Sequence, residues 1–126
     1  MDARQFAATV DHTLLQPSYS DDQIIRLCAE ARQYGFASVC VFPSAVALAT
    51  GELEGSNVAV CTVVGFPFGA TFGLVKSHEA RESIARGATE IDMVINIAAL
   101  KNGRLDDVLI DIEEAVSYTH LTLPTI

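Results

Sequence analysis

Apolar runs and amphipathic stretches alternate along most of the chain. Four apolar runs are typical of buried strands, and they cover residues 10–15, 37–42, 58–64 and 90–97. The segments between and after them have the spacing of helices, at about residues 20–34, 44–50, 72–86 and 105–116. Because single helices separate consecutive apolar strands, the pattern predicts βαβ units and a parallel sheet.

The first predicted helix has clear local signals at both ends. Ser20 and Gln23 have the spacing of a capping box, and Gly35 is a typical helix stop. The apolar positions of this helix repeat at i, i+3, i+4 and i+7, on Ile24, Leu27, Cys28 and Ala31. We expect that face to pack on the sheet.

The last predicted helix and the residues after it differ in composition. The apolar face of the helix is expected to consist of Leu105, Val108, Leu109, Ile112 and Val116. Residues 117–126 then contain three threonines and a proline, and no charge apart from a protonatable His120. We interpret residues 1–116 as one domain and residues 117–126 as a foreign or disordered tail. A natural fifth strand at residues 121–123 is the alternative.

Two α/β architectures fit four strands separated by helices. One is part of a (β/α)8 barrel, and the other is an open doubly wound sheet. A complete barrel needs about 250 residues, whereas the chain has 126. A complete doubly wound domain would bind a phosphate or another small ligand at the glycine-rich segment 65–73, without catalysis.

The acidic composition narrows the range of partners. The formal charge of −8 and the isoelectric point near 4.6 argue against binding to nucleic acid or to an anionic membrane. The longest apolar stretch, residues 58–70, contains glycines and a proline and falls short of the ~20 residues that span a bilayer. Residues 1–6 show no signal segment, so we expect a cytoplasmic chain.

The cysteines, histidines and lysines form no familiar motif. Cys28, Cys40 and Cys61 are widely spaced in apolar surroundings, which predicts reduced core cysteines. The histidines lack the HExxH spacing, and no metal site is expected. Lys76 and Lys101 are expected to be solvated, because an imine-forming lysine needs a desolvated pocket or a cationic neighbour.

Two aspartates stand inside predicted strands. Asp92 interrupts an apolar run that is expected to be buried, and Asp11 lies in the first strand. A buried carboxylate without a partner is costly, and parallel βα folds place their chemistry at the carboxyl ends of strands. Each aspartate is therefore a candidate for proton transfer or for pairing with a buried cation. A structural salt bridge is the alternative for both.

Four motifs resemble the deoxyribose-phosphate aldolase family, in the family's order and each at a predicted strand end. They are DHTLLQP (11–17), FASVCVFPS (36–44), VCTVVGFPFGA (60–70) and GATEIDMVINIAALKNG (87–103). The resemblance implies an α/β fold, a partial TIM (β/α)8 barrel made of about its first four βα units. It also implies a class I Schiff-base aldolase without metal or cofactor. The implied substrate is a phosphorylated sugar, 2-deoxy-D-ribose 5-phosphate, which is cleaved to D-glyceraldehyde 3-phosphate and acetaldehyde in deoxynucleoside breakdown.

The resemblance also implies roles for individual residues. Asp92 matches the family's catalytic aspartate, a proton donor and acceptor, and Asp11 matches a supporting aspartate expected near an active-site cation. Cys40 matches a strand-end position that faces the substrate, without an obligatory chemical role. Segments like KTSTGF and KASGG, which carry the imine-forming lysine and its neighbouring lysine in the family, do not occur in the sequence. We therefore expect the N-terminal half of such a barrel, inactive alone and prone to self-association through open sheet edges.

Two further interpretations stay open. A different imine-forming aldolase could share the early strands of the barrel. A non-enzymatic interaction protein is the weaker alternative, because carboxylates inside strands have no evident purpose there.

Overall fold

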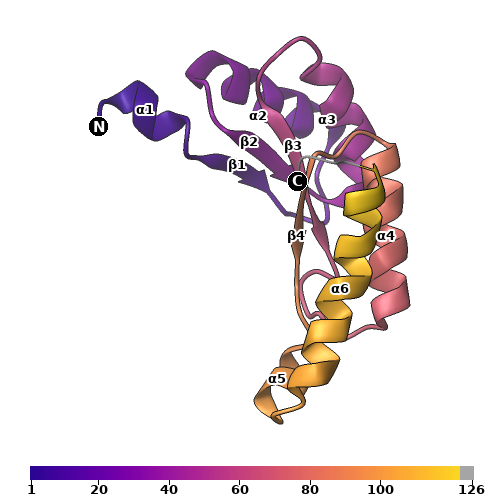
Figure 1. Ribbon diagram of the computed structural model, residues 1–126. Coiled ribbons are helices and arrows are strands. Elements are labelled where there is room, and N and C mark those ends of the chain that lie inside the picture. Colours follow the sequence, from indigo (N-terminus) through magenta and orange to yellow (C-terminus); the bar gives the residue numbers. More distant parts are fainter. Residues whose placement is uncertain (123–126) are drawn as a thin grey trace.

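The computed structural model of the chain describes the backbone of residues 1–122 and the side chains of residues 1–117 (Figure 1). The four strands are β1 (Asp11–Leu14), β2 (Ser38–Val41), β3 (Ala59–Val64) and β4 (Glu90–Met93). The helices are α1 (Ala3–Ala7), α2 (Asp21–Tyr34), α3 (Val46–Glu52), α4 (Gly73–Ala85), α5 (Ile97–Lys101) and α6 (Leu105–Thr122), with a 3-10 turn at Pro43–Ala45.

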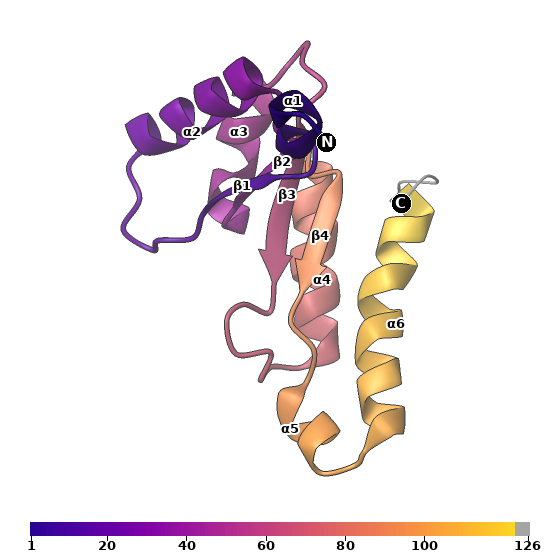
Figure 2. The same cartoon turned by 90° about the vertical axis from the view of Figure 1, so that its left-hand side faces the viewer.

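The strands form one parallel sheet in the order β1-β2-β3-β4. Each strand pairs with its neighbours in the sequence, so β1 and β4 are the free edges. Figures 1 and 2 show a curved sheet with α2, α3 and α4 along its convex side. Among the described residues, no helix layer covers the concave side. A doubly wound sheet has helices on both faces, and the structure therefore matches part of a (β/α)8 barrel instead.

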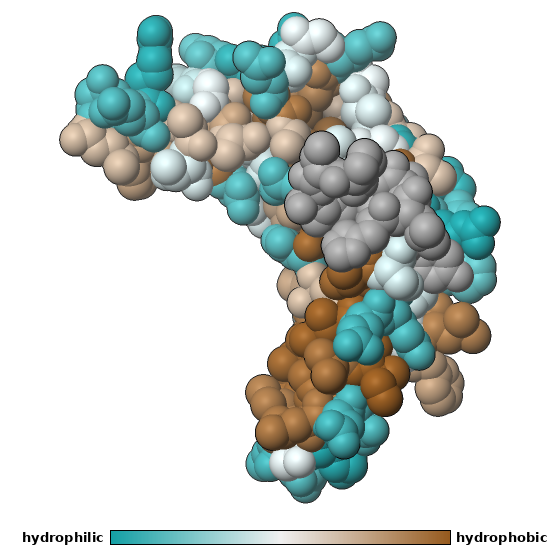
Figure 3. Space-filling view, in the orientation of Figure 1, coloured by the Kyte–Doolittle hydropathy of each residue, from teal (hydrophilic) through white to brown (hydrophobic). Residues whose placement is uncertain are grey.

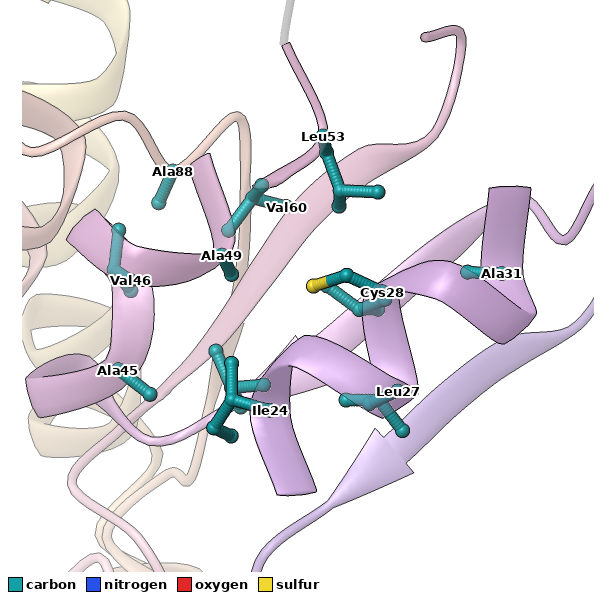
Figure 4. Packing of buried hydrophobic residues seen from close by; sticks show 12 residues of the cluster. Ile24, Leu27, Cys28, Ala31, Ala45, Val46, Ala49, Leu53, Val60 and Ala88 are labelled. Atoms are coloured by element: carbon teal, nitrogen blue, oxygen red, sulfur yellow. The ribbon is translucent and has the colours of Figure 1, made fainter. Parts of the chain in front are cut away.

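The main hydrophobic core lies between the convex face of the sheet and helices α2 and α3 (Figure 4). The α2 helix begins after Ser20, whose hydroxyl accepts from the Gln23 amide, and ends at Gly35 with φ 69°. Its predicted apolar face is buried throughout. The core cluster consists of Ile24, Leu27, Cys28, Ala31, Val39, Val41, Ala45, Val46, Ala49, Leu53, Val60 and Ala88. The predicted helix and its contact with the sheet are confirmed.

The fourth strand is shorter than its apolar run predicts. It ends at Met93, and a short helix, α5, begins after Asn96, whose side chain accepts from the Ala99 amide. An asparagine at a helix N-cap redirects the chain in this way, because it satisfies an amide that has no partner within the helix. Val94 still donates a backbone hydrogen bond to Val64 of β3, and the chain leaves the sheet after it, at the carboxyl end of β4.

The α6 helix packs on α4 with a face that differs from the predicted one. Of the five predicted residues only Val108 is buried, whereas Leu105 and Leu109 are 63% and 53% exposed. Within residues 105–117, the other buried residues of α6 are Asp111 and Ala115. The predicted face is wrong because the helix turns Asp111 inward toward α4, which rotates most of the larger apolar side chains toward solvent.

These side chains contribute to an apolar surface. Figure 3 shows a continuous hydrophobic area over the part of the molecule where β4 leads into α5 and α6. The exposed large apolar residues of α5 and α6 are Ile97, Leu100, Leu105, Leu109, Ile110, Ile112 and Val116. No helix in the described part of the chain is both long enough and apolar enough to cross a membrane.

The backbone continues as a helix beyond the expected domain boundary. The α6 helix runs from Leu105 to Thr122 without a break at residue 117. Two residues of the alternative fifth strand, 121 and 122, are thus helical, and residue 123 lies outside the described residues. The assignment of residues 117–126 as a foreign tail stays a prediction.

Candidate active site

The alternation of side chains along each strand separates the sheet into two faces. Residues of one set pack on the helices, and residues of the other set face the concave side, which we call the inner face. On β2 and β3 the inner face carries the small buried cluster of Cys40, Cys61 and Val63, against which Leu15 and Phe42 pack. On the edge strands the same alternation places Asp11, Thr13, Glu90 and Asp92 on the inner face. The curved, uncovered side of the sheet is therefore polar at its edges and apolar at its centre.

Asp92 lies on this inner face, next to the two thiols. It is the third residue of β4 and pairs with Val63 of β3, close to the carboxyl ends of both strands. The sulfur atoms of Cys40 and Cys61 and a carboxylate oxygen of Asp92 all lie within 4.8 Å of one another. The expectation that Asp92 is buried is wrong for this chain, because β4 is an edge strand and no described helix covers the inner face.

Asp11 lies on the same face at the opposite edge of the sheet. It pairs with Ser38 in the strand ladder, and the Ser38 hydroxyl donates a hydrogen bond of 2.7 Å to Asp11 Oδ1. The serine is completely buried, so this bond fixes the carboxylate against the sheet. Strands β2 and β3 separate Asp11 from Asp92, and the structure therefore puts the two predicted site residues on one surface without bringing them into contact.

Glu90 is an inner-face carboxylate that the sequence reasoning missed. Partial burial of its carboxylate raises the pKa of Glu90, and the neighbouring charges of Asp11 and Asp92 raise it further. The i, i+2 spacing of Glu90 and Asp92 could have revealed this residue, since such a pair shares one face of a strand. Among the residues with described side chains, no lysine, arginine or histidine forms an ion pair with any of these three carboxylates.

The thiols of Cys40 and Cys61 shift each other's pKa in opposite directions. A side-chain hydrogen bond with Cys61 lowers the pKa of Cys40, although burial and the nearby carboxylates, Asp92 first, oppose this. The same hydrogen bond raises the pKa of Cys61, and burial raises it further. All three cysteines are buried and free of disulfides, which confirms the sequence prediction.

Lys76 is not solvated, contrary to the prediction. Its side chain is fully buried, and its Nζ atom donates a 2.6 Å hydrogen bond to Asp111 Oδ2. The same oxygen accepts a hydrogen bond of 3.0 Å from the backbone amide of Asn96. Lys101, by contrast, is exposed at the end of α5, as expected. The sequence interpretation failed for Lys76 because its partner stands 35 residues away.

The glycine-rich segment 65–73 is a structural turn in this chain. The Gly65 amide donates a 2.7 Å hydrogen bond to Glu79 Oε1, and the Gly69 amide bonds to Gly65 O. Gly69 has φ 64°, and a Cβ atom there would come within 2.1 Å of the Ile95 carbonyl oxygen. The Gly65 amide is already bound to a carboxylate and the Gly69 amide to a backbone carbonyl, so neither is available to an anion. The structure therefore gives no support to phosphate binding at this turn.

Four surface hollows formed by described residues do not include Asp11 or Asp92 in their linings. One hollow is lined by residues such as Arg32, Phe36 and Asn57. These residues lie at the amino ends of the strands, opposite the edge at which Asp92 stands. We therefore describe the candidate site by the side chains of the inner face and not by any of these hollows.

Comparison with known proteins identifies what this arrangement is similar to. No protein-family model matches the chain. A deoxyribose-phosphate aldolase from Clostridium kluyveri is 51% identical over 117 residues, which are 93% of this chain and 54% of that protein. The corresponding enzyme from Staphylococcus epidermidis is 54% identical over 110 residues, or 87% of this chain and 50% of its own length. The chain thus spans about half the length of the curated relatives it matches.

Solved structures agree with the sequence comparison. A candidate deoxyribose-phosphate aldolase from Coccidioides immitis superposes with a TM-score of 0.92 at 39% identity, over 94% of this chain and 47% of that one. A tetrameric deoxyribose phosphate aldolase from Aeropyrum pernix gives a TM-score of 0.80 at 31% identity, over 93% and 50% of the two chains. In sequence and in fold, this chain therefore resembles about half of a deoxyribose-phosphate aldolase, as its motifs predict.

Proposed function

We propose that this chain carries the proton-transfer side of a deoxyribose-phosphate aldolase site. The reaction would be the cleavage of 2-deoxy-D-ribose 5-phosphate to D-glyceraldehyde 3-phosphate and acetaldehyde by way of an imine, without a metal or cofactor. The observation that supports it best is the position of Asp92 on the inner face near the carboxyl end of β4. Enzymes with this fold place their reacting groups at that edge of the barrel.

In this proposal Asp92 moves protons to and from the substrate. A carboxylate on a strand end is held in place by the sheet, and it can accept a proton in one step and return it in the next. Asp11 has a supporting role, because its charge and its Ser38 hydrogen bond prepare the β1 edge of the inner face for a cation. Glu90 adds a third negative charge to the same surface.

The imine-forming amine would come from a lysine outside this chain. Lys76 is buried, and its Nζ atom is bound to Asp111 of α6. Lys101 is exposed on α5 and belongs to no strand. An imine requires an unprotonated amine positioned over the substrate carbonyl, and neither lysine meets that condition. We therefore expect no aldolase activity from this chain alone.

Borohydride trapping tests the inactivity of the isolated chain. Incubation with 2-deoxy-D-ribose 5-phosphate and borohydride should leave the intact mass unchanged. A covalent adduct that peptide mapping assigns to Lys76 or Lys101 would contradict the proposal.

A chimera tests the role of Asp92 directly. The 110 residues that match the Staphylococcus epidermidis enzyme would replace the corresponding segment of that enzyme. The chimera should cleave 2-deoxy-D-ribose 5-phosphate, and Asp92→Asn should lower its kcat by at least about 100-fold, the lower end for loss of a general acid–base. Glu82→Gln on the exposed face of α4 is the matched control and should leave kcat unchanged. An Asp92→Asn chimera with full activity would refute the proposed role.

A further inference from the structure

The inner face contains a second arrangement of reactive groups, which the proposed aldolase chemistry does not use. Cys40 on β2 and Cys61 on β3 are directly paired in the strand ladder, so their side chains leave the sheet side by side. Asp92 on β4 stands diagonally beside them. Three adjacent strands thus bring two sulfur ligands and one oxygen ligand to one point, with all three ligand atoms within 4.8 Å of one another.

We propose that Cys40, Cys61 and Asp92 form a binding site for a thiophilic divalent cation, with Zn²⁺ as the best fit. Thiolate and carboxylate ligands are the donors that zinc combines in proteins. With Zn–S bonds of about 2.3 Å, two thiolates on one tetrahedral zinc stand about 3.8 Å apart. The ligand atoms therefore need to move by only about 1 Å to enclose the ion, and the exposed Asp92 side chain has room for that movement.

The electrostatic surroundings favour a cation at this point. The charges that act on Cys40 come from Asp92, Asp11 and Glu90, and all three are negative. Within the part of the chain whose side chains are described, no basic group forms an ion pair with them. A divalent cation at the thiols would relieve the mutual repulsion of these carboxylates. Hard cations such as Mg²⁺ are less suited, because they avoid sulfur ligands.

The site would be open and not closed. Three protein ligands leave the fourth position of a tetrahedral ion to water, as in zinc sites that remain accessible to small molecules. Binding releases one proton from each thiol, while the Asp92 carboxylate donates an oxygen lone pair without a change in oxidation state. Because the ion would occupy the carboxylate that the proposed aldolase chemistry needs, zinc and substrate would compete for Asp92.

The inference does not depend on the proposed aldolase function, and it can be tested on the 126-residue chain itself. The reduced chain, kept in a phosphine reductant, would be titrated with Co²⁺ and followed by thiolate-to-cobalt charge-transfer absorption. We expect one Co²⁺ per chain with tetrahedral d–d bands, and stoichiometric displacement of the cobalt by Zn²⁺. Absence of the charge-transfer band would overturn the proposal.

Three variants identify the ligands. Asp92→Asn, at an exposed position that should not disturb folding, should weaken Co²⁺ binding at least about tenfold, since loss of even an outer-shell partner costs 10–100-fold. Cys40→Ser should remove most of the charge-transfer band, with circular dichroism as the check on folding. Cys28→Ala is the matched control, because this third cysteine lies in the separate core under α2. An undiminished charge-transfer band in Cys40→Ser, or loss of the band in Cys28→Ala, would refute the assignment. Unchanged Co²⁺ affinity in Asp92→Asn would refute it as well.

Discussion

The Lys76 ammonium group lies 2.6 Å from Asp111 Oδ2, and the two side chains are 0% and 7% exposed. This ion pair joins α4 to α6, two helices that follow different strands. Through the Asn96 amide, which donates to the same carboxylate oxygen, it also holds the turn that leads away from β4. A charge pair in the helix layer thus stabilises the segment that follows Asp92.

Removing one partner of this ion pair should lower the free energy of unfolding more than removing both partners. Lys76→Met leaves the Asp111 carboxylate buried without its cation, and we expect a loss of about 3–5 kcal/mol in the free energy of unfolding. The double variant Lys76→Met with Asp111→Leu should recover most of that loss, because it removes both desolvated charges. Urea denaturation measures both effects.

An exposed ion pair supplies the control for this comparison. Glu82 and Arg86 approach within 3.6 Å on the surface of α4, with side chains about 60% exposed. Glu82→Gln should change the free energy of unfolding by less than about 1 kcal/mol. If Lys76→Met lowers the free energy of unfolding no more than Glu82→Gln does, the buried pair does not hold α4 to α6.

The close approach of Gly69 to Ile95 should make the turn after β3 intolerant of a side chain. Gly69→Ala places a methyl group within 2.1 Å of the Ile95 carbonyl oxygen, at a backbone φ of 64°. Gly35→Ala is the control, because Gly35 has φ 69° and nothing within 4 Å of the added atom. In the control, the free energy of unfolding should fall by about 1–2 kcal/mol, because alanine disfavours a left-handed backbone. Gly69→Ala should lower it by clearly more. Equal falls in the melting temperature of the two variants would contradict a close approach of Gly69 to Ile95.

Neutralising Glu90 should stabilise the chain. Since its pKa is raised in the folded state, folding favours the protonated form of Glu90. That contribution to stability is present below the ordinary glutamate pKa and is lost as the pH rises through the folded value. Glu90→Gln should therefore raise the melting temperature at neutral pH. The gain in the free energy of unfolding should be less than about 1 kcal/mol, because the side chain of Glu90 is exposed. The gain should shrink below pH 4 and at high salt, and a loss of stability at neutral pH would contradict this.

The Cys28 thiol should make stability fall at alkaline pH. Burial, and secondarily the Glu52 carboxylate, raise the pKa of Cys28 from 9.0 to about 11. Its contribution to stability is complete below pH 9 and is lost as the pH rises toward 11, because the unfolded chain releases this proton first. The difference in unfolding free energy between the wild type and Cys28→Ala should therefore narrow or reverse across that range. A constant difference would contradict the raised pKa.

The open edges of the sheet should cause association that depends on concentration. Sedimentation velocity should detect species larger than the monomer, since β1 and β4 present unpaired backbone groups. Thr13→Lys puts an inward-facing charge on the β1 edge and should weaken the association. Gln33→Lys on the exposed surface of α2 makes the same charge change and should not. A clean monomer at high concentration would contradict the prediction.

Local signals predicted those elements whose causes lie close in sequence. The α2 helix followed from Ser20, Gln23 and Gly35, all of which act within a few residues of their effect. The position of Asp92 on the fourth strand followed from the run of apolar residues around it. The short helix α5 was missed because its one signal, Asn96, stands inside a segment that reads as a strand.

The errors concern relationships between distant parts of the chain. The burial of Lys76 and the rotation of α6 both depend on Asp111, and no periodicity within one helix contains that information. The exposure of Asp92 depends on what covers the inner face, which a strand pattern does not specify. For the same reason, the meeting of Cys40, Cys61 and Asp92 becomes visible only when three strands lie side by side.

The sequential order of the strands has a consequence for how the chain acquires its shape. Every ladder joins strands that follow one another in the sequence, so each connection that must close spans only one crossover segment. Folding rates rise as contacts become more local, and synthesis delivers the amino-terminal units first. The sheet can therefore grow during translation, one strand and helix at a time, with each finished unit serving as the template for the next.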